Sequence, residues 1–304
     1  RFRKDISRRE GSSTRSIRSM AEATLSVRSR TSDPLPGFRL ALFSTLLWIG
    51  LIVVLPLTAL IVRPWQEGLG AMTMALHDGR MFAALRVSFV TAFIAALINV
   101  PVGLLLTWTL VRVQLPGRRI VDALIDLPFA IPTAVTGITL ATLYGPQGWL
   151  GKPLAHLGIS IAYSTAGIVV ALMFVGLPFI VRSVEPVLRG LPPEQEEAAG
   201  LLGASSWQTV WRVVLPSLLP ATVSGFGLAF ARGIGEYGSV IFIAGNQPFR
   251  TEIAPLLVVV RLQEFDYAGA TSIAFILLVA SMLCLAGVAM LRRRVARGLI
   301  TGVN

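Results

Sequence analysis

Arg232 and Glu236 are the residues whose types and spacing are most unusual for their surroundings. They stand four positions apart in an apolar run, residues 221–244, that holds no other charge. This spacing places both side chains on one face of a helix. A charged side chain inside a membrane span costs at least ~2.5–3.5 kcal/mol on insertion scales and by default marks function. Two interpretations stay open: a mutual ion pair that lets the helix insert, or a role in a pathway through the membrane.

Residue patterns for catalysis or cofactor binding are not found in the sequence. It holds no Gly-x-x-x-x-Gly-Lys-Ser/Thr phosphate loop, so the chain is not expected to bind ATP itself. The single cysteine, Cys284, excludes an internal disulfide and a multi-cysteine metal site. His77 and His156 fall in different loops without a second ligand at metal spacing. We therefore expect no catalytic residue, no metal site and no cofactor, and we do not expect an enzyme.

The composition is that of an integral membrane protein. Only 14% of the 304 residues are charged and 54% are hydrophobic, whereas a soluble domain carries about 25% charged residues. Six apolar segments, each near the ~20 residues that cross a bilayer, predict an all-α protein with about six transmembrane helices. They cover residues 40–62, 87–111, 123–144, 163–181, 221–244 and 268–291.

Several of these segments contain residues that are unusual in a plain anchor. Pro128 and Pro132 in the third segment, and Asn99 beside Pro101 in the second, weaken the helix where neighbouring helices or a wet cavity must satisfy the backbone. With Arg232 and Glu236 they form our candidate translocation pathway. The fifth segment carries two rows of small residues that allow close helix packing. The rows are Ala221, Gly225, Ala229, Gly233 and Gly227, Ala231, Gly235, Ser239.

The basic residues determine the expected orientation. With the N-terminus inside, residues 1–39, 112–120, 182–212 and 292–304 are cytoplasmic and hold twenty Arg and Lys, against six outside. The net charge of +11 is therefore explained by topology rather than by nucleic-acid binding. Both termini should be cytoplasmic.

The expected domain organisation follows from the same segments. Residues 1–36 form a basic extension, expected to be disordered. Of these, residues 1–19 precede Met20 and are either an upstream extension or a cloning remnant; an Arg- and Ser-rich plastid leader is the alternative. Residues 37–293 form the transmembrane domain, with a cytoplasmic loop at 183–216, and 294–304 form a tail.

The loop around residues 191–216 predicts two short helices. Pro193 suits a first helical position, Gly203 suits a left-handed helix end, and Ser205 with Gln208 has the spacing of a capping box. A short helix with small and apolar residues between two spans is suited to insertion into a partner. An amphipathic hairpin on the membrane surface is the alternative. A DNA-binding helix-turn-helix is disfavoured because three glutamates would repel phosphate.

The order of residues in this loop resembles the EAA loop of ABC-importer permeases. Glu197-Ala198-Ala199 is followed after three residues by Gly203, and after nine more by Val213-Val214-Leu215-Pro216. The resemblance implies a type I permease fold with a cytoplasmic loop between spans 4 and 5. It also implies that the first helix of the loop docks in a groove of a separate ATP-hydrolysing subunit. The docking candidates are Glu196, Glu197, Ala198, Ala199, Gly203, Leu215 and Pro216.

Three further stretches, residues 123–135, 235–246 and 251–253, resemble the sulfate/thiosulfate importer permeases. The Gly-Glu-aromatic-Gly and Gly-Asn elements are shared with molybdate permeases, although Tyr237 stands where Phe is more common. Residues 261–267, Arg-Leu-Gln-Glu-Phe-Asp-Tyr, look like the T-type rather than the W-type sulfate permease.

This resemblance implies a sulfate/thiosulfate importer in a bacterial inner membrane. The implied partners are a W-type permease, two ATP-binding subunits and a sulfate/thiosulfate-binding protein, besides membrane lipid. A molybdate or tungstate importer and a location in the plastid inner envelope remain alternatives. A passive channel would not need a docking loop, and an intramembrane enzyme would need more clustered groups than Arg232 and Glu236.

Overall fold

The computed structural model describes residues 37–66, 69–114 and 116–301, and within these ranges the secondary structure is helical without a strand. The chain divides into two compact units, residues 1–58 and 59–304. The first unit holds α2 (Phe38–Ile49), the π-helical turn η1 (Gly50–Val54) and the start of α3 (Leu55–Gln66). These elements form one apolar segment, Phe38–Arg63, that is long enough to cross a membrane.

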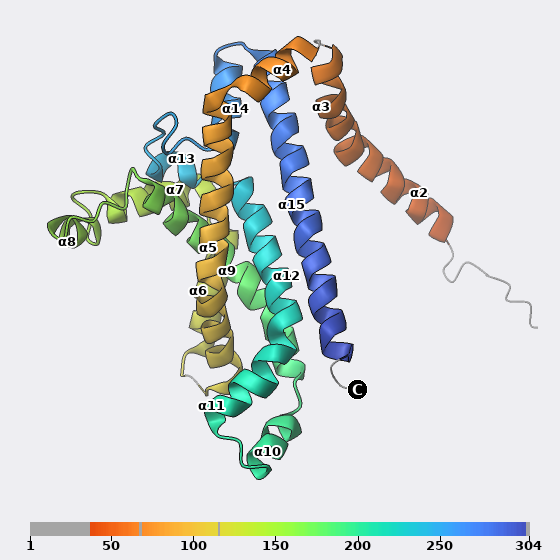
Figure 1. Ribbon diagram of the computed structural model, residues 1–304, viewed down its shortest axis with the longest axis vertical. Helices are drawn as coiled ribbons and strands as arrows, with labels where there is room; N and C mark the ends of the chain where they lie inside the picture. The colour runs from red at the N-terminus through yellow and green to blue at the C-terminus, as the bar shows by residue number, and fades with distance from the viewer. Residues whose placement is uncertain (1–36, 67–68, 115, 302–304) are drawn as a thin grey trace, which may run out of the picture. The chain divides into compact units, whose positions relative to one another are not determined.

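The second unit is a bundle of long and short helices (Figure 1). Five described helical segments, the one at Phe38–Arg63 included, are long and apolar enough to span a membrane, and one bent pair makes a sixth. This agrees with the predicted all-α membrane fold. The elements of the unit are α4 (Leu69–His77), α5 (Gly79–Arg112), α6 (Arg118–Ala130), α7 (Thr133–Tyr144), α8 (Gly151–His156), α9 (Thr165–Gly190), α10 (Pro193–Leu201), α11 (Ser206–Thr209), η2 (Val210–Val214), α12 (Leu215–Ile234), α13 (Val240–Ile243), α14 (Ala254–Gln263) and α15 (Tyr267–Thr301).

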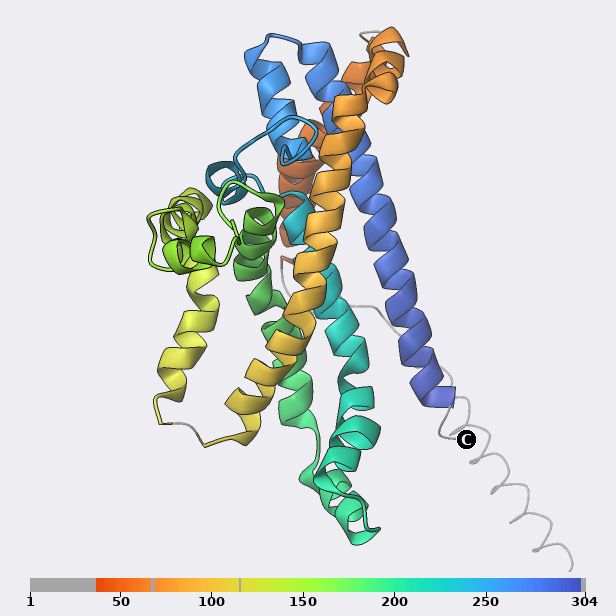
Figure 2. The same ribbon diagram turned by 60° about the vertical axis from the view of Figure 1, so that its left-hand side comes forward.

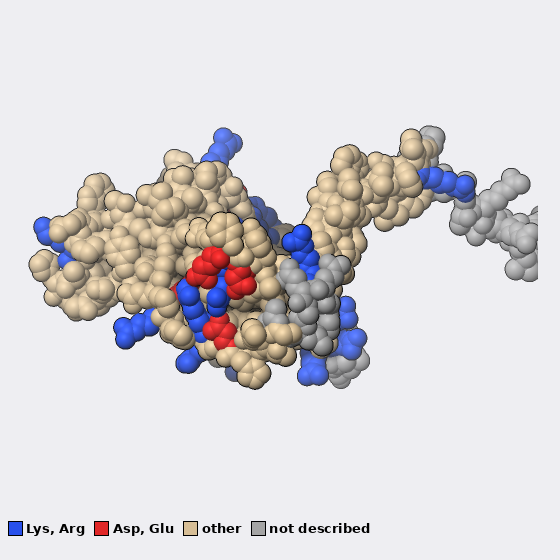
Figure 3. Space-filling model, turned by 90° about the horizontal axis from the view of Figure 1, so that it is seen from above, with Lys and Arg blue, Asp and Glu red and all other residues tan. Residues whose placement is uncertain are grey.

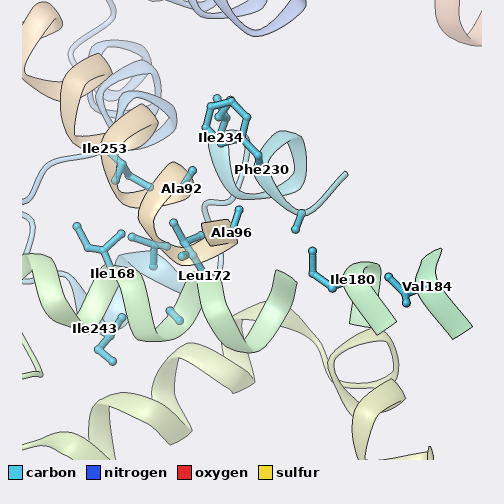
Figure 4. Close-up of a cluster of buried hydrophobic side chains, with 14 of the residues drawn as sticks. Ala92, Ala96, Ile168, Leu172, Ile180, Val184, Phe230, Ile234, Ile243 and Ile253 are labelled. Atoms are coloured by element: carbon cyan, nitrogen blue, oxygen red, sulfur yellow. The ribbon is translucent and has the colours of Figure 1, made fainter. Parts of the chain in front are cut away.

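The core lies where α5, α9 and α12 pack together. Figure 4 shows small residues of α5 and larger apolar residues of α9 and α12 gathered in one cluster. Asn99 of α5 is buried there, and its side-chain amide donates a hydrogen bond of 3.0 Å to the Met173 carbonyl of α9. A Cβ on Gly176 would lie 2.9 Å from that amide nitrogen, so the glycine makes room for the bond.

The small residues of α12 face its neighbours on two sides. A Cβ on Gly225 would lie 2.9 Å from the Ile180 Cα of α9, and one on Gly227 would lie 2.5 Å from Val288 Cγ1 of α15. Glycine therefore permits backbone approaches that a side chain would prevent. Gly225 and Gly227 thus serve packing inside this subunit, whereas Gly235 and Ser239 lie beyond the end of α12, and a Cβ on Gly235 would meet no atom within 4 Å.

We expect Gly225→Leu to lower the stability of the bundle, because overpacking a tight contact costs ~1–3 kcal/mol. The measurement is membrane abundance and melting temperature in detergent, for the chain expressed alone. Gly287→Leu is the matched control, since a Cβ on Gly287 of α15 meets no atom within 4 Å. Equal losses for both variants would contradict the packing role of Gly225.

The third predicted span is a broken pair rather than one helix. The axes of α6 and α7 differ by 111°, and Pro132 is the N-cap of α7. Ile131 before it is extended, with φ −88° and ψ 133°, as a residue that precedes proline prefers. Pro128 is tolerated inside α6, so only the second proline coincides with the break.

The fifth predicted span, residues 221–244, is also not one helix. Helix α12 ends at Ile234, residues 235–239 form a turn, and α13 follows. A Cβ on Gly238 would lie 2.2 Å from Thr133 Oγ1, and one on Gly137 would lie 2.4 Å from the Ser239 carbonyl oxygen. The turn therefore packs directly against the beginning of α7. Close contact of two backbones, and not hydropathy, sets the end of α12.

Candidate functional site

The first helix of the loop and the start of the second form as their residues predict, but the second is not short: α11, η2 and α12 continue as one helical segment, Ser206–Ile234, because a proline near the start of a helix does not interrupt it. Glu194 and Glu196 lie in the first turn of α10, where the helix dipole favours negative charge. Gly203 follows with φ +84°, a conformation that other residues adopt only with strain. Ser205 and Gln208 form both bonds of a capping box at α11. Figures 1 and 2 show α10 and α11 at the end of the second unit opposite α4 and α14.

Four large apolar side chains on this loop are exposed, and we call them the apolar tip: Leu201, Leu202, Trp207 and Trp211. Leu201 and Leu202 are 90% and 89% exposed. The Trp207 and Trp211 rings meet edge to face, with centroids 5.4 Å apart. Single exposed apolar residues need no explanation, but a group of this size at the end of a loop marks an interaction site.

The docking candidates divide between the exposed surface and the attachment to the bundle. Glu197, Ala198 and Gly203 are exposed, while Ala199 is half-buried. Glu196 is half-buried and forms an ion pair with Arg112 at the end of α5. A cavity of about 240 Å³ between Trp108 of α5 and the two loop helices lies beside this pair. Leu215 and Pro216, both half-buried, begin α12.

Arg232 and Glu236 form the ion pair that their spacing predicts. Arg232 Nη2 and Glu236 Oε2 are 2.8 Å apart, and the side chains are 40% and 1% exposed. Glu236 Oε1 also accepts hydrogen bonds of 3.0 Å from the backbone N–H and the hydroxyl of Ser239. Glu236 lies beyond the last residue of α12, so its carboxylate holds the turn together while the guanidinium reaches a more open space.

The other pathway candidates lie in two different places. Asn99 is buried between α5 and α9 with its amide bonded to Met173, which gives it a helix-packing role. Pro132 begins α7, the helix against which the turn of Glu236 packs. Pro128 lies one turn earlier, inside α6. The structure therefore brings Arg232, Glu236 and the α6–α7 break into one neighbourhood.

An ion-pair cluster at the loop end of the bundle was missed in the sequence. Arg182 of α9 forms a bidentate pair with Asp126 of α6, at 2.6 and 2.9 Å. It also reaches Asp122 Oδ1 at 2.8 Å and Glu185 Oε2 at 2.6 Å. The only sequence signal is the spacing of each pair along its own helix, Asp122 with Asp126 and Arg182 with Glu185. The cluster fastens α6, which stands beside α9 in Figure 2, to the rest of the bundle.

Comparison with known proteins places this architecture among importer components. Residues 99–300 match the family described as binding-protein-dependent transport system inner membrane component. The chain is 47% identical to the sulfate transport system permease protein CysT of Escherichia coli (strain K12) over 266 residues, which cover 88% of this chain and 96% of that protein. It is 47% identical over 241 residues to CysT of Synechocystis sp. (strain ATCC 27184 / PCC 6803 / Kazusa), covering 79% and 84%.

The solved structures that resemble the chain support the fold. A chain of a bacterial ABC transporter involved in the import of the acidic polysaccharide alginate aligns with a TM-score of 0.71 at 17% identity. The alignment covers 84% of this chain and 94% of that one.

Proposed function

Since the chain belongs to the family of binding-protein-dependent transport system inner membrane components, and within it to the CysT-like sulfate permeases, we propose that it carries sulfate and thiosulfate through the membrane as one permease subunit of an ATP-driven importer. The apolar tip is the observation that carries the proposal. A passive channel has no use for a capped, protruding helical loop with exposed leucines and tryptophans. A transport subunit driven by a separate ATPase needs such a surface.

The docking element of the proposed importer is α10 with the residues that follow it. Glu197, Ala198 and Ala199 lie on this helix, and Gly203 turns the chain toward α11. The pair of Glu196 with Arg112 joins α10 to the end of α5. Movement of α10 is therefore passed to a helix of the core, which is the coupling that an ATP-driven transporter requires.

The proposed assembly contains this chain, a W-type permease, two ATP-binding subunits and a sulfate/thiosulfate-binding protein. ATP is bound by the partner subunits. The relatives named as sulfate permeases favour sulfate over molybdate or tungstate as the cargo. In this proposal Arg232 offers the anion a half-exposed guanidinium, and Glu236 limits the attraction so that the anion can leave.

Uptake by the reconstituted complex tests the cargo. With all partner subunits present, we expect ATP-dependent accumulation of radiolabelled sulfate, and competition by thiosulfate in preference to molybdate. Vesicles lacking the binding protein are the control. Accumulation without ATP, or preferential competition by molybdate, would contradict the proposal.

We also propose that the membrane is the bacterial inner membrane, with both termini and the docking loop in the cytoplasm. The motivation is the excess of basic residues in the segments expected to be inside. A reporter fused after Gly298 should give a cytoplasmic signal, and one inserted within residues 145–152 a periplasmic signal. A periplasmic signal from the C-terminal fusion would rule out this orientation.

A further inference from the structure

A cavity with two arginines lies at the end of the second unit opposite the docking loop. Its volume is about 270 Å³, and its lining includes Arg86, Thr91, Thr165, Phe249 and Arg250. Arg86 lies near the start of α5, and Thr165 is the first residue of α9. Phe249 and Arg250 belong to the loop before α14. Since one water takes about 30 Å³ of liquid, a small anion fits with part of its hydration shell.

Among the described residues, the two guanidinium groups differ from their basic neighbours in having no acidic partner. Arg80 forms a pair with Glu252, and Arg261 with Asp78, Glu264 and Asp266. No carboxylate of a described residue lies within 4.0 Å of the Arg86 or Arg250 side chain. Figure 3 shows acidic and basic side chains gathered in one cluster when the molecule is seen from this end, with other basic side chains apart from it.

The loop that carries Arg250 is held firmly in place. The Gln247 carbonyl accepts hydrogen bonds from the backbone N–H groups of Arg250, Thr251 and Glu252. The Gln247 N–H donates to Thr251 Oγ1 at 2.9 Å. Phe249 has φ +64°, a conformation that costs about 1–3 kcal/mol and persists only where the surroundings impose it. The structure therefore maintains a strained turn beside Arg250.

Two contacts fasten the same loop to α5 on either side of Arg86. Glu252, which is buried, accepts two hydrogen bonds from Arg80, at 2.7 and 2.8 Å. The Ala254 N–H donates to Ser88 Oγ at 2.8 Å. Arg80 and Ser88 lie on either side of Arg86 in the sequence of α5. The loop is therefore bound to the same turns of α5 that carry Arg86. The path of the loop backbone relative to α5 is thus set by the fold, while the Arg86 and Arg250 side chains are themselves exposed at the mouth of the cavity.

The chemistry of the cavity suits a doubly charged tetrahedral oxyanion. Guanidinium groups bind such anions through paired, charge-assisted hydrogen bonds. Ser164 makes no side-chain capping bond at the start of α9, a helix of 26 residues, and the positive end of its dipole adds to the attraction. We propose that Arg86 and Arg250 form a receiving site for the transported oxyanion at the outward end of the permease. This inference rests on the proposed function.

A protection experiment on the whole reconstituted complex tests the site. Thr165→Cys, made in a Cys284→Ser background, places one thiol at the cavity for labelling by a negatively charged thiol reagent. Sulfate should slow the labelling at least fivefold. Arg86→Gln with Arg250→Gln should abolish this protection, whereas Lys152→Gln, the loss of an exposed cation outside the cavity, should leave it intact.

Transport supplies the second measurement. Each Arg→Gln change should lower sulfate uptake about tenfold, since hydrogen bonds from a charged group are lost. ATP hydrolysis stimulated by the loaded binding protein should persist. Unchanged uptake in the double variant at normal membrane abundance would overturn the site. A parallel loss of ATPase stimulation would also overturn it, because the arginines would then hold the binding protein.

A lipid phosphate group shares the chemistry of the cargo, and the membrane composition separates the two. Labelling is therefore compared in nanodiscs of zwitterionic and of anionic lipid. If sulfate slows the labelling in both kinds of nanodisc, the receiving site is supported. If anionic lipid slows the labelling and sulfate has no effect on it, the cavity binds a lipid headgroup and the proposal is overturned. A native complex that moves no sulfate would refute the proposed function, which is a different result from these.

Discussion

The Leu201→Asp/Leu202→Asp variant is expected to lose both ATPase co-purification and sulfate uptake, by at least a hundredfold, while its membrane abundance stays normal. Both side chains are about nine-tenths exposed, so the free subunit does not depend on them. In the assembled importer their burial contributes roughly 1.5–3 kcal/mol each, and burying unpaired carboxylates instead costs more. The measurement is pull-down of the ATPase with the permease, followed by uptake in vesicles.

Leu157→Asp is the matched control for this variant. Leu157 is 74% exposed and lies at the end of α8, which is far from α10 in both ribbon views (Figures 1 and 2). It tests whether any exposed leucine gives the same loss of the ATPase. If the double variant keeps the ATPase, or if Leu157→Asp loses it equally, α10 is not the docking element.

Glu236→Leu is expected to have the largest effect on the amount of folded protein. The change removes the partner of Arg232 and leaves the N–H and hydroxyl of Ser239 without their acceptor in a buried turn. Arg232 is 40% exposed and can be hydrated, so the cost comes mainly from the buried Ser239 donors that lose their acceptor, ~1–3 kcal/mol each, against the ~5–15 kcal/mol that holds a protein folded. We expect membrane abundance to fall at least tenfold.

The double change Arg232→Gln/Glu236→Gln separates structure from transport. Glutamine keeps an oxygen that can accept from Ser239, and neither charge is left alone, so abundance should return to near the native level. Uptake should remain reduced about tenfold or more, because the anion loses a charged donor. Radiolabelled sulfate uptake, normalised to abundance, measures this. Full recovery of uptake would reduce Arg232 and Glu236 to a structural pair.

The sequence by itself determined the features that depend on near neighbours in the chain. Hydropathy predicts the membrane class and about six spans. The capping box of Ser205 and Gln208, the left-handed Gly203 and the pairing of Arg232 with Glu236 also follow from spacing. Each involves residues at most four apart, whose geometry is set once a helix or a turn forms. The docking loop was for this reason the part predicted in most detail.

Hydropathy could not determine where individual helices end. Helix α15 continues to Thr301, past the arginines at 292–294, because arginine is a good helix former. The charge of these arginines ends the membrane span, but it does not end the helix. Helix α12 stops at Ile234 because the following turn fits against α7 through Gly137 and Gly238. Both ends depend on factors other than the apolarity of the segment.

Contacts between distant residues were decided by the tertiary structure alone. Arg182 meets Asp126 across 56 positions, and Arg80 meets Glu252 across 172. An arginine near the end of a span has several acidic residues it could pair with, and spacing along the chain does not choose among them. Helix packing makes the choice, because it brings particular helix faces together. The same packing leaves Arg86 and Arg250 in one cavity without a carboxylate of the described residues nearby.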